Sequence, residues 1–325
     1  MKKIYLLLIF LFYGFCVKSQ QPLYNQYMLN PYIINPAIAG YNGYTDINLM
    51  TRQQWVGYDN GPSTYAISGQ HRILKTSYRN RSRLIKNNIR RKRPSGKVGI
   101  GGIIYNDTNG SIVRTGLQGT YSYHIYVRDI QYSMGFSLSM FQFKTNIEQK
   151  DFYEQDIIDP ILQNNNSIFS PDANIGFLIS SDDYYAGISI SNLFQNNISF
   201  GNDKEFGFKL NRHYYILGGY KYQKRRSDYS FEPSVMITLT EKLLWNIDLN
   251  IKAIYMDNYW AGLSYRSSGS IISMFGLKYT NYYLGYSFDL SWSDVSTFNK
   301  YGSHELLIGI RFGDNARRYR WLNRF

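Results

Sequence analysis

Short stretches in which apolar and polar residues alternate cover most of this chain, and they constrain the fold more than any other feature. In the run 245–255, the odd positions are apolar or aromatic, and the even positions as far as 252 are Asn, Asp, Asn and Lys. A period of two is typical of a β-strand with one apolar and one polar face. Many such strands of about ten residues, with no helical domain to cover them, predict a transmembrane β-barrel.

The alternation predicts fourteen strands, an even number, as single-chain bacterial barrels have. Their expected bounds are 45–52, 63–72, 96–106, 112–127, 130–144, 172–180, 184–192, 213–222, 229–240, 243–254, 258–266, 270–279, 281–290 and 302–312. The expected fold class is therefore all-β, a single antiparallel transmembrane barrel over residues 45–312. No internal helix, long linker or sequence repeat indicates a second domain.

Aromatic residues support the membrane interpretation. The chain has 32 tyrosines, and aromatic residues make up 17% of it. Tyrosine and tryptophan gather at membrane–water boundaries, where outer-membrane barrels carry two aromatic girdles. The mean hydropathy of −0.37 is too polar for a helical membrane protein, but a barrel needs apolar residues on one face only. A tyrosine-rich soluble β-sandwich is the alternative.

The first residues have the pattern of a secretory signal peptide. Positive charge at Lys2 and Lys3 precedes the apolar stretch 4–15, which is too short to span a membrane as a helix. We expect cleavage after Ser19, so that residues 1–19 are removed. A lipoprotein signal at Cys16 is the weaker alternative because a bulky residue precedes it. A mature chain that begins after Ser19 has no cysteine and uses neither disulfides nor thiol chemistry.

Connection lengths predict the orientation of the barrel. The even-numbered connections are mostly short and several odd-numbered ones are long. Barrels of this kind have short periplasmic turns and long outer loops. We therefore expect the even-numbered side and both termini to be periplasmic. The connection 73–95 is the exception, since it lies on this side and is far longer than a turn.

A dense basic tract occupies that exceptional connection. Residues 72–97 contain eleven lysines and arginines and no acidic residue, and a basic tail follows at 313–325. Such a tract can bind nucleic acid, but an exported barrel meets acidic lipid headgroups, acidic polymers or acidic protein faces instead. A solvated loop is the alternative. The candidate partner-binding residues on this predicted periplasmic face are Arg90, Arg91, Lys92, Arg93, Arg317 and Arg318.

No residue pattern for catalysis, cofactor binding or metal binding is present in the sequence. The four histidines are dispersed, no cysteine lies near them, and there is neither a Gly-x-Ser-x-Gly elbow nor a phosphate loop. We expect no enzyme activity, cofactor or metal. A surface protease built from rim residues is a minor alternative, with Asp107, Asp203, Glu205 and His213 as its candidates.

Small residues on the predicted inward faces bear on what fills the lumen. Gly135, Ser137 and Ser139 are expected to point inward, because they alternate with the apolar residues of the same strand. Their small size leaves room in the lumen for water, a ligand, a plug or inward-folded loops, and we favour the loops. Residues 20–44 form an irregular lead-in with two Asn-Pro turn signals. We expect this lead-in to be a partial plug, and a simple N-terminal latch is the alternative.

Parity also predicts a contact where the barrel closes. Arg52 and Glu305 both point inward at the same end of the first and last predicted strands, which become neighbours on closure. We predict that these two side chains meet across the seam, with His304 nearby. Trp55, just beyond the first strand, is expected in the outer aromatic girdle.

Several motifs together resemble a known family. They are Gln-Tyr-Met-Leu-Asn-Pro at 26–31, Asn-Pro-Ala-Ile-Ala-Gly at 35–40, Arg-Gln-Gln-Trp-Val-Gly at 52–57, Gly-Pro-Ser-Thr at 61–64 and Gly-Ser-His-Glu-Leu at 302–306. The mature chain resembles the PorP/SprF family of outer-membrane proteins of the type IX secretion system in Bacteroidetes. The motif residues are Asn35, Pro36, Ala37, Gly40, Arg52, Gln53, Gln54, Trp55, Gly57, Pro62, His304 and Glu305.

The resemblance implies a non-enzymatic barrel in the outer membrane of a Gram-negative bacterium that serves secretion, surface attachment or gliding motility. Two roles compete: a receptor that binds or anchors a secreted adhesin through its C-terminal domain, and a link to periplasmic components. Expected partners are that domain, other type IX secretion or gliding components and outer-membrane lipid, but not nucleic acid. A porin-like channel for small solutes is the alternative. The basic tract at 72–97 is longer than the family pattern leads us to expect for this connection.

Overall fold

The computed structural model describes residues 24–58, 60–73, 96–127, 129–145, 167–199, 207–224, 227–292 and 301–313. The long strands are β1 (Thr45–Gln53), β2 (Ser63–Arg72), β3 (Gly96–Asn109), β4 (Ile112–Val127), β5 (Ile130–Thr145), β6 (Ile168–Ser180), β7 (Tyr184–Ser191), β10 (His213–Tyr220), β12 (Tyr229–Thr240), β13 (Trp245–Tyr255), β14 (Tyr259–Arg266), β15 (Ser270–Tyr279), β16 (Tyr282–Ser291) and β17 (Ser303–Phe312). Short elements are the 3-10 helices η1 (Pro31–Ile33) and η2 (Pro36–Ile38), and the strands β8 (Asn197–Ser199), β9 (Gly207–Lys209) and β11 (Tyr222–Gln223).

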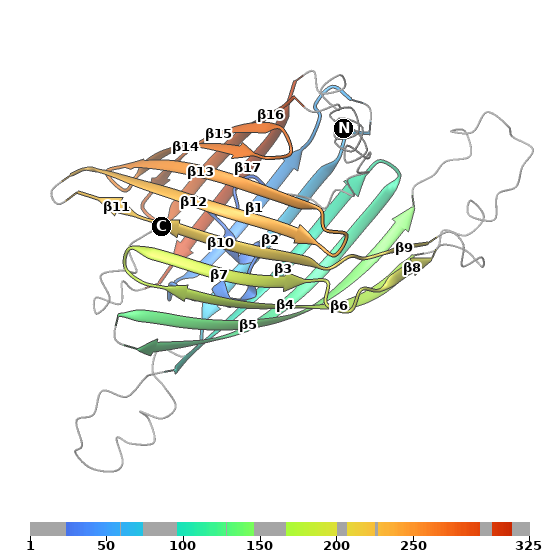
Figure 1. The fold of residues 1–325 in the computed structure, drawn as a ribbon, viewed down its shortest axis with the longest axis horizontal. Helices are drawn as coiled ribbons and strands as arrows, with labels where there is room; N and C mark the ends of the chain where they lie inside the picture. The colour runs from blue at the N-terminus through green and yellow to red at the C-terminus, as the bar shows by residue number, and fades with distance from the viewer. Residues whose placement is uncertain are drawn as a thin grey trace, which may run out of the picture.

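The long strands close into one antiparallel barrel (Figure 1). Within the described ranges fourteen of them pair in a ring, which β10 and β12 close on one side and β1 and β17 close on the other. The short strand β11 extends the edge of β12, and β8 pairs only with β9 in a separate hairpin. The predicted all-β fold with fourteen strands is confirmed.

Residues that alternate between apolar and polar in the sequence lie alternately on the outer and the inner face of the barrel wall. In β4, Leu117 and Tyr121 on the outer face are 59% and 54% exposed, whereas Ser122 and His124 on the inner face are fully buried. Successive side chains of a strand point to opposite faces, so the outer surface is a continuous apolar and aromatic band. A band of this kind requires an apolar solvent such as lipid.

Most predicted strand bounds agree with the structure to within two residues, and the exceptions lie at the barrel rim. β3 runs three residues beyond the predicted 96–106, and β6 begins four residues before the predicted 172–180. The predicted strand 213–222 is divided into β10 and β11. The hairpin β8–β9 lies in a stretch predicted as a loop, because its strands are only three residues long and show no period.

The lead-in enters the barrel as an interior segment (residues 24–44), drawn in deep blue within the ring of strands in Figure 1. Its Asn-Pro pairs start the two 3-10 helices, where proline occupies the first position and its missing N–H is not needed. The Asn35 side chain accepts a hydrogen bond from the Ala37 amide at 2.9 Å, which caps η2. In the described part of the chain, no helix has the length and apolar character needed to cross a membrane.

Candidate functional site

Glycines that face the lumen allow the interior segment to pack directly against the barrel wall. A side chain at Gly135 would collide with the backbone of Pro36 and Ala37, and one at Gly176 would collide with Asn35. Only glycine allows the two backbones to approach this closely. The prediction that small inward residues accommodate inward-folded loops is therefore wrong at Gly135, where the lead-in takes the space.

Hydrogen bonds tie the interior segment to the wall at β4, β6 and β7. The hydroxyl of Tyr32, which is fully buried, donates a hydrogen bond to the Thr120 hydroxyl on β4 at 2.7 Å. The Asn35 side-chain amide donates to the carbonyls of Phe177 on β6 and Ile188 on β7, at 3.1 and 3.3 Å. Buried polar groups need such partners, so these bonds fix the segment in position.

Arg72 holds the C-terminal end of the interior segment. Its Nε donates to the Gly40 carbonyl at 2.8 Å, and its Nη2 donates to the Tyr41 carbonyl. Gly40 itself has a φ of +66°, where glycine is favoured, and its amide donates to the Gln70 side chain at 3.0 Å. Arg72 and Lys97 are both buried, at 3% and 6% exposure, so the two ends of the basic tract belong to the barrel interior and not to a solvated loop.

A carboxylate holds the N-terminal end of the interior segment. Glu305 on β17 is 1% exposed, and its two oxygens accept the backbone amides of Asn25 at 2.8 Å and Gln26 at 2.9 Å. The Gln26 side chain donates to the Glu305 carbonyl at 2.9 Å. A carboxylate that accepts two amide hydrogen bonds is a strong, charge-assisted anchor.

Glu305 belongs to a buried charge cluster (Arg52, Asp248, Arg266, Asp289 and Glu305). Arg52 Nη1 lies 4.0 Å from Glu305 and Arg52 Nη2 lies 3.5 Å from Asp289. Arg266 donates to both oxygens of Asp248 at 3.0 and 3.1 Å and also approaches Asp289 at 3.9 Å. Two cations face three anions, and the amides of the interior segment supply the further donors for the excess negative charge.

The predicted seam contact is confirmed. Arg52 and Glu305 are register partners across β1 and β17, and their side chains meet in the charge cluster. His304 is the next residue on β17 and its side chain lies on the other face, where its ring packs 5.2 Å from that of Phe288 and its Nδ1 lies 2.6 Å from the Tyr286 hydroxyl. Strand alternation and closure predict the pair, but they do not predict Asp248, Arg266 and Asp289, because the curvature of the barrel brings those side chains into the cluster.

The remaining motif residues gather beside the seam. Gln53 is the register partner of His304, and the Gln54 amide donates to the Pro62 carbonyl at 2.8 Å, which closes the β1–β2 connection. The Trp55 amide donates to a serine side chain of β17 at 3.3 Å. Gly57 has a φ of +93° and would collide with a tyrosine ring if it carried a side chain. Placement of Trp55 in an outer girdle stays a prediction.

The candidates for a surface protease are not assembled by the described residues. Asp107 accepts a hydrogen bond from Thr64 at 2.6 Å, and His213 Nδ1 lies 3.0 Å from the Asn211 carbonyl. Asp203 and Glu205 lie outside the described residues, as do Arg90, Arg91, Lys92, Arg93, Arg317 and Arg318. Across the described ranges, no group of three His, Cys, Asp or Glu side chains could hold a metal ion.

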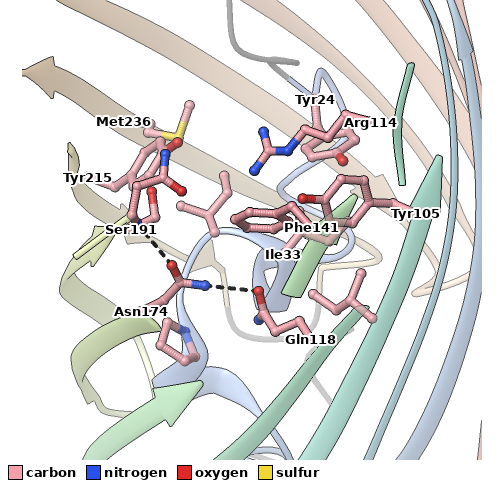
Figure 2. A pocket seen from close by; sticks show the side chains of 14 residues that line it. Tyr24, Ile33, Tyr105, Arg114, Gln118, Phe141, Asn174, Ser191, Tyr215 and Met236 are labelled. Atoms are coloured by element: carbon pink, nitrogen blue, oxygen red, sulfur yellow. Dashed lines mark hydrogen bonds between the residues drawn. The ribbon is translucent and has the colours of Figure 1, made fainter. Parts of the chain in front are cut away.

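A cavity of about 100 Å³ lies between the interior segment and the wall formed by β3 to β7 together with β10 and β12 (Figure 2). Ile33 and Tyr24 of the interior segment form one side, and Phe141 forms part of the other. The guanidinium of Arg114 projects over the cavity from β4, and the amides of Gln118 and Asn174 line its floor.

A closed antiparallel barrel with an apolar outer band and a polar interior defines an outer-membrane β-barrel protein. The model of one family, described as type IX secretion system membrane protein PorP/SprF, matches residues 16–310. The chain belongs to this family and is therefore an outer-membrane component of the type IX secretion system that associates with other secretion components. Neither the family nor the fold is that of an enzyme.

Solved barrels are similar at low identity. The TodX monoaromatic hydrocarbon channel (a deltaS2 mutant) is 9% identical, with a TM-score of 0.47 over 87% of this chain and 92% of that one. Outer membrane protein Omp33 of Acinetobacter baumannii is 8% identical, with a TM-score of 0.42 over 84% of this chain and 100% of that one. No curated protein matches the sequence.

Proposed function

We propose that this protein binds a secreted surface adhesin through the adhesin's C-terminal domain, holds it at the outer membrane and thereby supports secretion or gliding motility. Membership of the PorP/SprF family supports a role in type IX secretion. The proposal adds the kind of partner and the mode of action, which is binding and not solute conduction.

The observation that carries the proposal is the interior segment in the lumen. It is buried from Tyr27 to Ala39 at most positions, and anchors at Arg72 and Glu305 hold its two ends. A channel for small solutes needs an open, water-filled lumen lined by charges. Here the side chains of the buried charge cluster and Arg72 are engaged with one another or with the segment, which supports a plugged barrel with a binding role.

In the proposed orientation, the short even-numbered connections and both termini lie in the periplasm, and the long connections face outward. The basic tract and the tail then share one periplasmic face, where Arg90, Arg91, Lys92, Arg93, Arg317 and Arg318 are available to an acidic partner. The outer end would hold the adhesin domain, and this basic face would contact periplasmic components of the system.

The direct test of the adhesin proposal is co-purification. The tagged protein is isolated from its native outer membrane in mild detergent, and the bound proteins are identified by mass spectrometry. We expect a large secreted protein retained through its C-terminal domain, together with secretion subunits. A barrel that purifies alone after gentle crosslinking would contradict the proposal.

The basic face is tested separately. Replacing Arg90, Arg91, Lys92 and Arg93 with serine removes four charges, and we expect weaker recovery of periplasmic partners with the adhesin still bound. The matched control changes the three arginines to lysine, which keeps the charge and should keep the association. Unchanged recovery with the serine variant would refute the proposed role of the tract.

A further inference from the structure

Arg114 lies at the edge of the cavity and forms no ion pair with another described residue. Its guanidinium lies 4.0 Å from the centre of the Phe141 ring, and the rings of Tyr105 and Phe143 are 5.5 and 5.6 Å away. Stacking on aromatic faces leaves the edge of a guanidinium, with its N–H donors, free to bind a ligand. The Nε of Arg114 is buried and has no hydrogen-bond partner among the described residues.

Two carboxylates, Asp107 on β3 and Asp172 on β6, lie near Arg114 without forming an ion pair with it. Asp107 is the register partner of Arg114 across β3 and β4, but one of its oxygens accepts the Thr64 hydroxyl at 2.6 Å. Asp172 on β6 accepts the amides of Ala173 at 2.7 Å and Phe194 at 3.1 Å, both on Oδ1, and its Oδ2 is buried with no hydrogen-bond partner among the described residues. Among the described residues, no ion pair includes Arg114.

The other arginines of the interior have carboxylate or carbonyl partners. Arg52, Arg266 and Arg311 each lie in an ion pair, and Arg72 donates to two backbone carbonyls. A cation withdrawn from bulk water is stable only when a counter-charge or acceptors compensate for its lost hydration. The arrangement around Arg114 supplies aromatic faces, but among the described residues no carboxylate forms an ion pair with it.

The size and lining of the cavity limit the size and chemical nature of a ligand that could accept hydrogen bonds from Arg114. A volume of about 100 Å³ is enough for one small group but not for a folded element. Apolar side chains such as Ile33, Ile103 and Met236 form much of the lining, and the Asn174 and Gln118 amides are hydrogen-bonded to each other at 2.9 Å (Figure 2). The lining therefore favours a planar charged head on an apolar stem.

We propose that this cavity is a binding site for a carboxylate group, which Arg114 holds through two parallel hydrogen bonds from its two Nη groups. Guanidinium and carboxylate match in planar, bidentate geometry, and an apolar stem would pack on the isoleucines of the cavity. The carboxylate belongs either to a short organic acid or to the end or acidic side chain of an entering peptide. The site is independent of the proposed adhesin function.

The test uses the purified full-length protein in detergent micelles and ¹³C-carboxyl-labelled butyrate as the probe, with binding followed by NMR titration. We expect saturable binding of butyrate and none of its neutral isostere, butyramide. An acetylated pentapeptide with a free terminal carboxylate is compared with its amidated form. Tighter binding of the free peptide than of butyrate assigns the site to a peptide, and the reverse order assigns it to an organic acid.

Two variants connect the binding to the guanidinium. Arg114→Gln should weaken carboxylate binding about tenfold to hundredfold, the value of a charge-assisted hydrogen bond, and Arg114→Lys should retain the charge but lose the bidentate geometry and bind about tenfold more weakly. Arg212→Gln is the matched control, because Arg212 is already paired with Glu241 at 3.1 Å.

Folding of each variant is checked by the heat-dependent electrophoretic shift of the barrel. Three results would each overturn the proposal: no binding of butyrate or free peptide to the wild type, equal binding of butyramide, or equal affinities for the wild type and a folded Arg114→Gln or Arg114→Lys variant.

Discussion

The anchor at Glu305 allows a sharp test of how the interior segment is held. Glu305→Gln is nearly isosteric, so the barrel wall keeps its packing while the carboxylate charge disappears. In the wild type the two carboxylate oxygens accept the amides of Asn25 and Gln26 at 2.8 and 2.9 Å. In the variant one of these amides faces an NH2 group, and Arg52 loses one of its two carboxylate partners.

The magnitude follows from these contacts. Removing one partner of a buried ion pair destabilises a protein by about 3 to 5 kcal/mol, and the lower end applies because the new amide still accepts one hydrogen bond. A loss of about 3 kcal/mol in the docking of the segment corresponds to roughly a hundredfold greater population of its released state. The effect is local, since the strand pairing of β17 does not depend on this side chain.

Amide hydrogen exchange measures this population directly. Protection at Asn25 and Gln26 should fall about a hundredfold in Glu305→Gln, while the strands keep theirs. The control is Glu241→Gln, because the pair of Glu241 with Arg212 is about one-third exposed and contributes about 1 kcal/mol or less. Unchanged protection at both amides in a folded Glu305→Gln variant would refute the anchoring argument.

Three further predictions concern the stability of the interior. Gly135→Ala should destabilise the folded protein by about 1 to 3 kcal/mol in denaturant titrations, because the new methyl group collides with the interior segment. At Gly119 a methyl group would have no atom within 4 Å, so Gly119→Ala should change stability by less than about 0.5 kcal/mol. Equal effects of the two substitutions would contradict the close approach at Gly135. In the wild type, Lys252 Nζ lies 2.7 Å from the carboxylate of Glu232, so Lys252→Met leaves that carboxylate buried and unpaired and should lower the free energy of unfolding by about 3 to 5 kcal/mol. Adding Glu232→Gln should restore most of this stability, and a double variant no more stable than Lys252→Met would contradict the pairing. Asn35→Ala removes a cap and two wall hydrogen bonds, so protection of the interior segment should fall by about 1 to 3 kcal/mol, and a fall of only a few tenths would count against this role.

The barrel itself could be predicted from the sequence because its determinant is local. A strand whose faces meet lipid and a polar lumen must alternate at a period of two, so the pattern in β4 or β12 alone gives both the bounds and the side-chain directions. Closure then adds one long-range fact, the adjacency of β1 and β17. This adjacency and parity together were sufficient to predict the pair of Arg52 and Glu305.

The contents of the lumen could not be predicted in the same way. Parity says that Gly135 and Gly176 point inward, but not that the backbone of residues 35–37 occupies the space beside them. The position of Asp289 between Arg52 and Arg266 depends on the curvature that brings β1, β14 and β16 together. The position of Arg114 over the cavity, without an ion pair to Asp107 or Asp172, likewise depends on how several strands come together, which no single strand encodes.

Single-channel conductance of the purified protein in a planar bilayer tests the central claim most directly, namely that the interior segment closes the barrel and the protein acts by binding. The account predicts no steady conductance for the wild type, and channel activity once residues 24–40 are deleted. A stable, open conductance of the intact wild-type protein would contradict the account and favour a channel for small solutes.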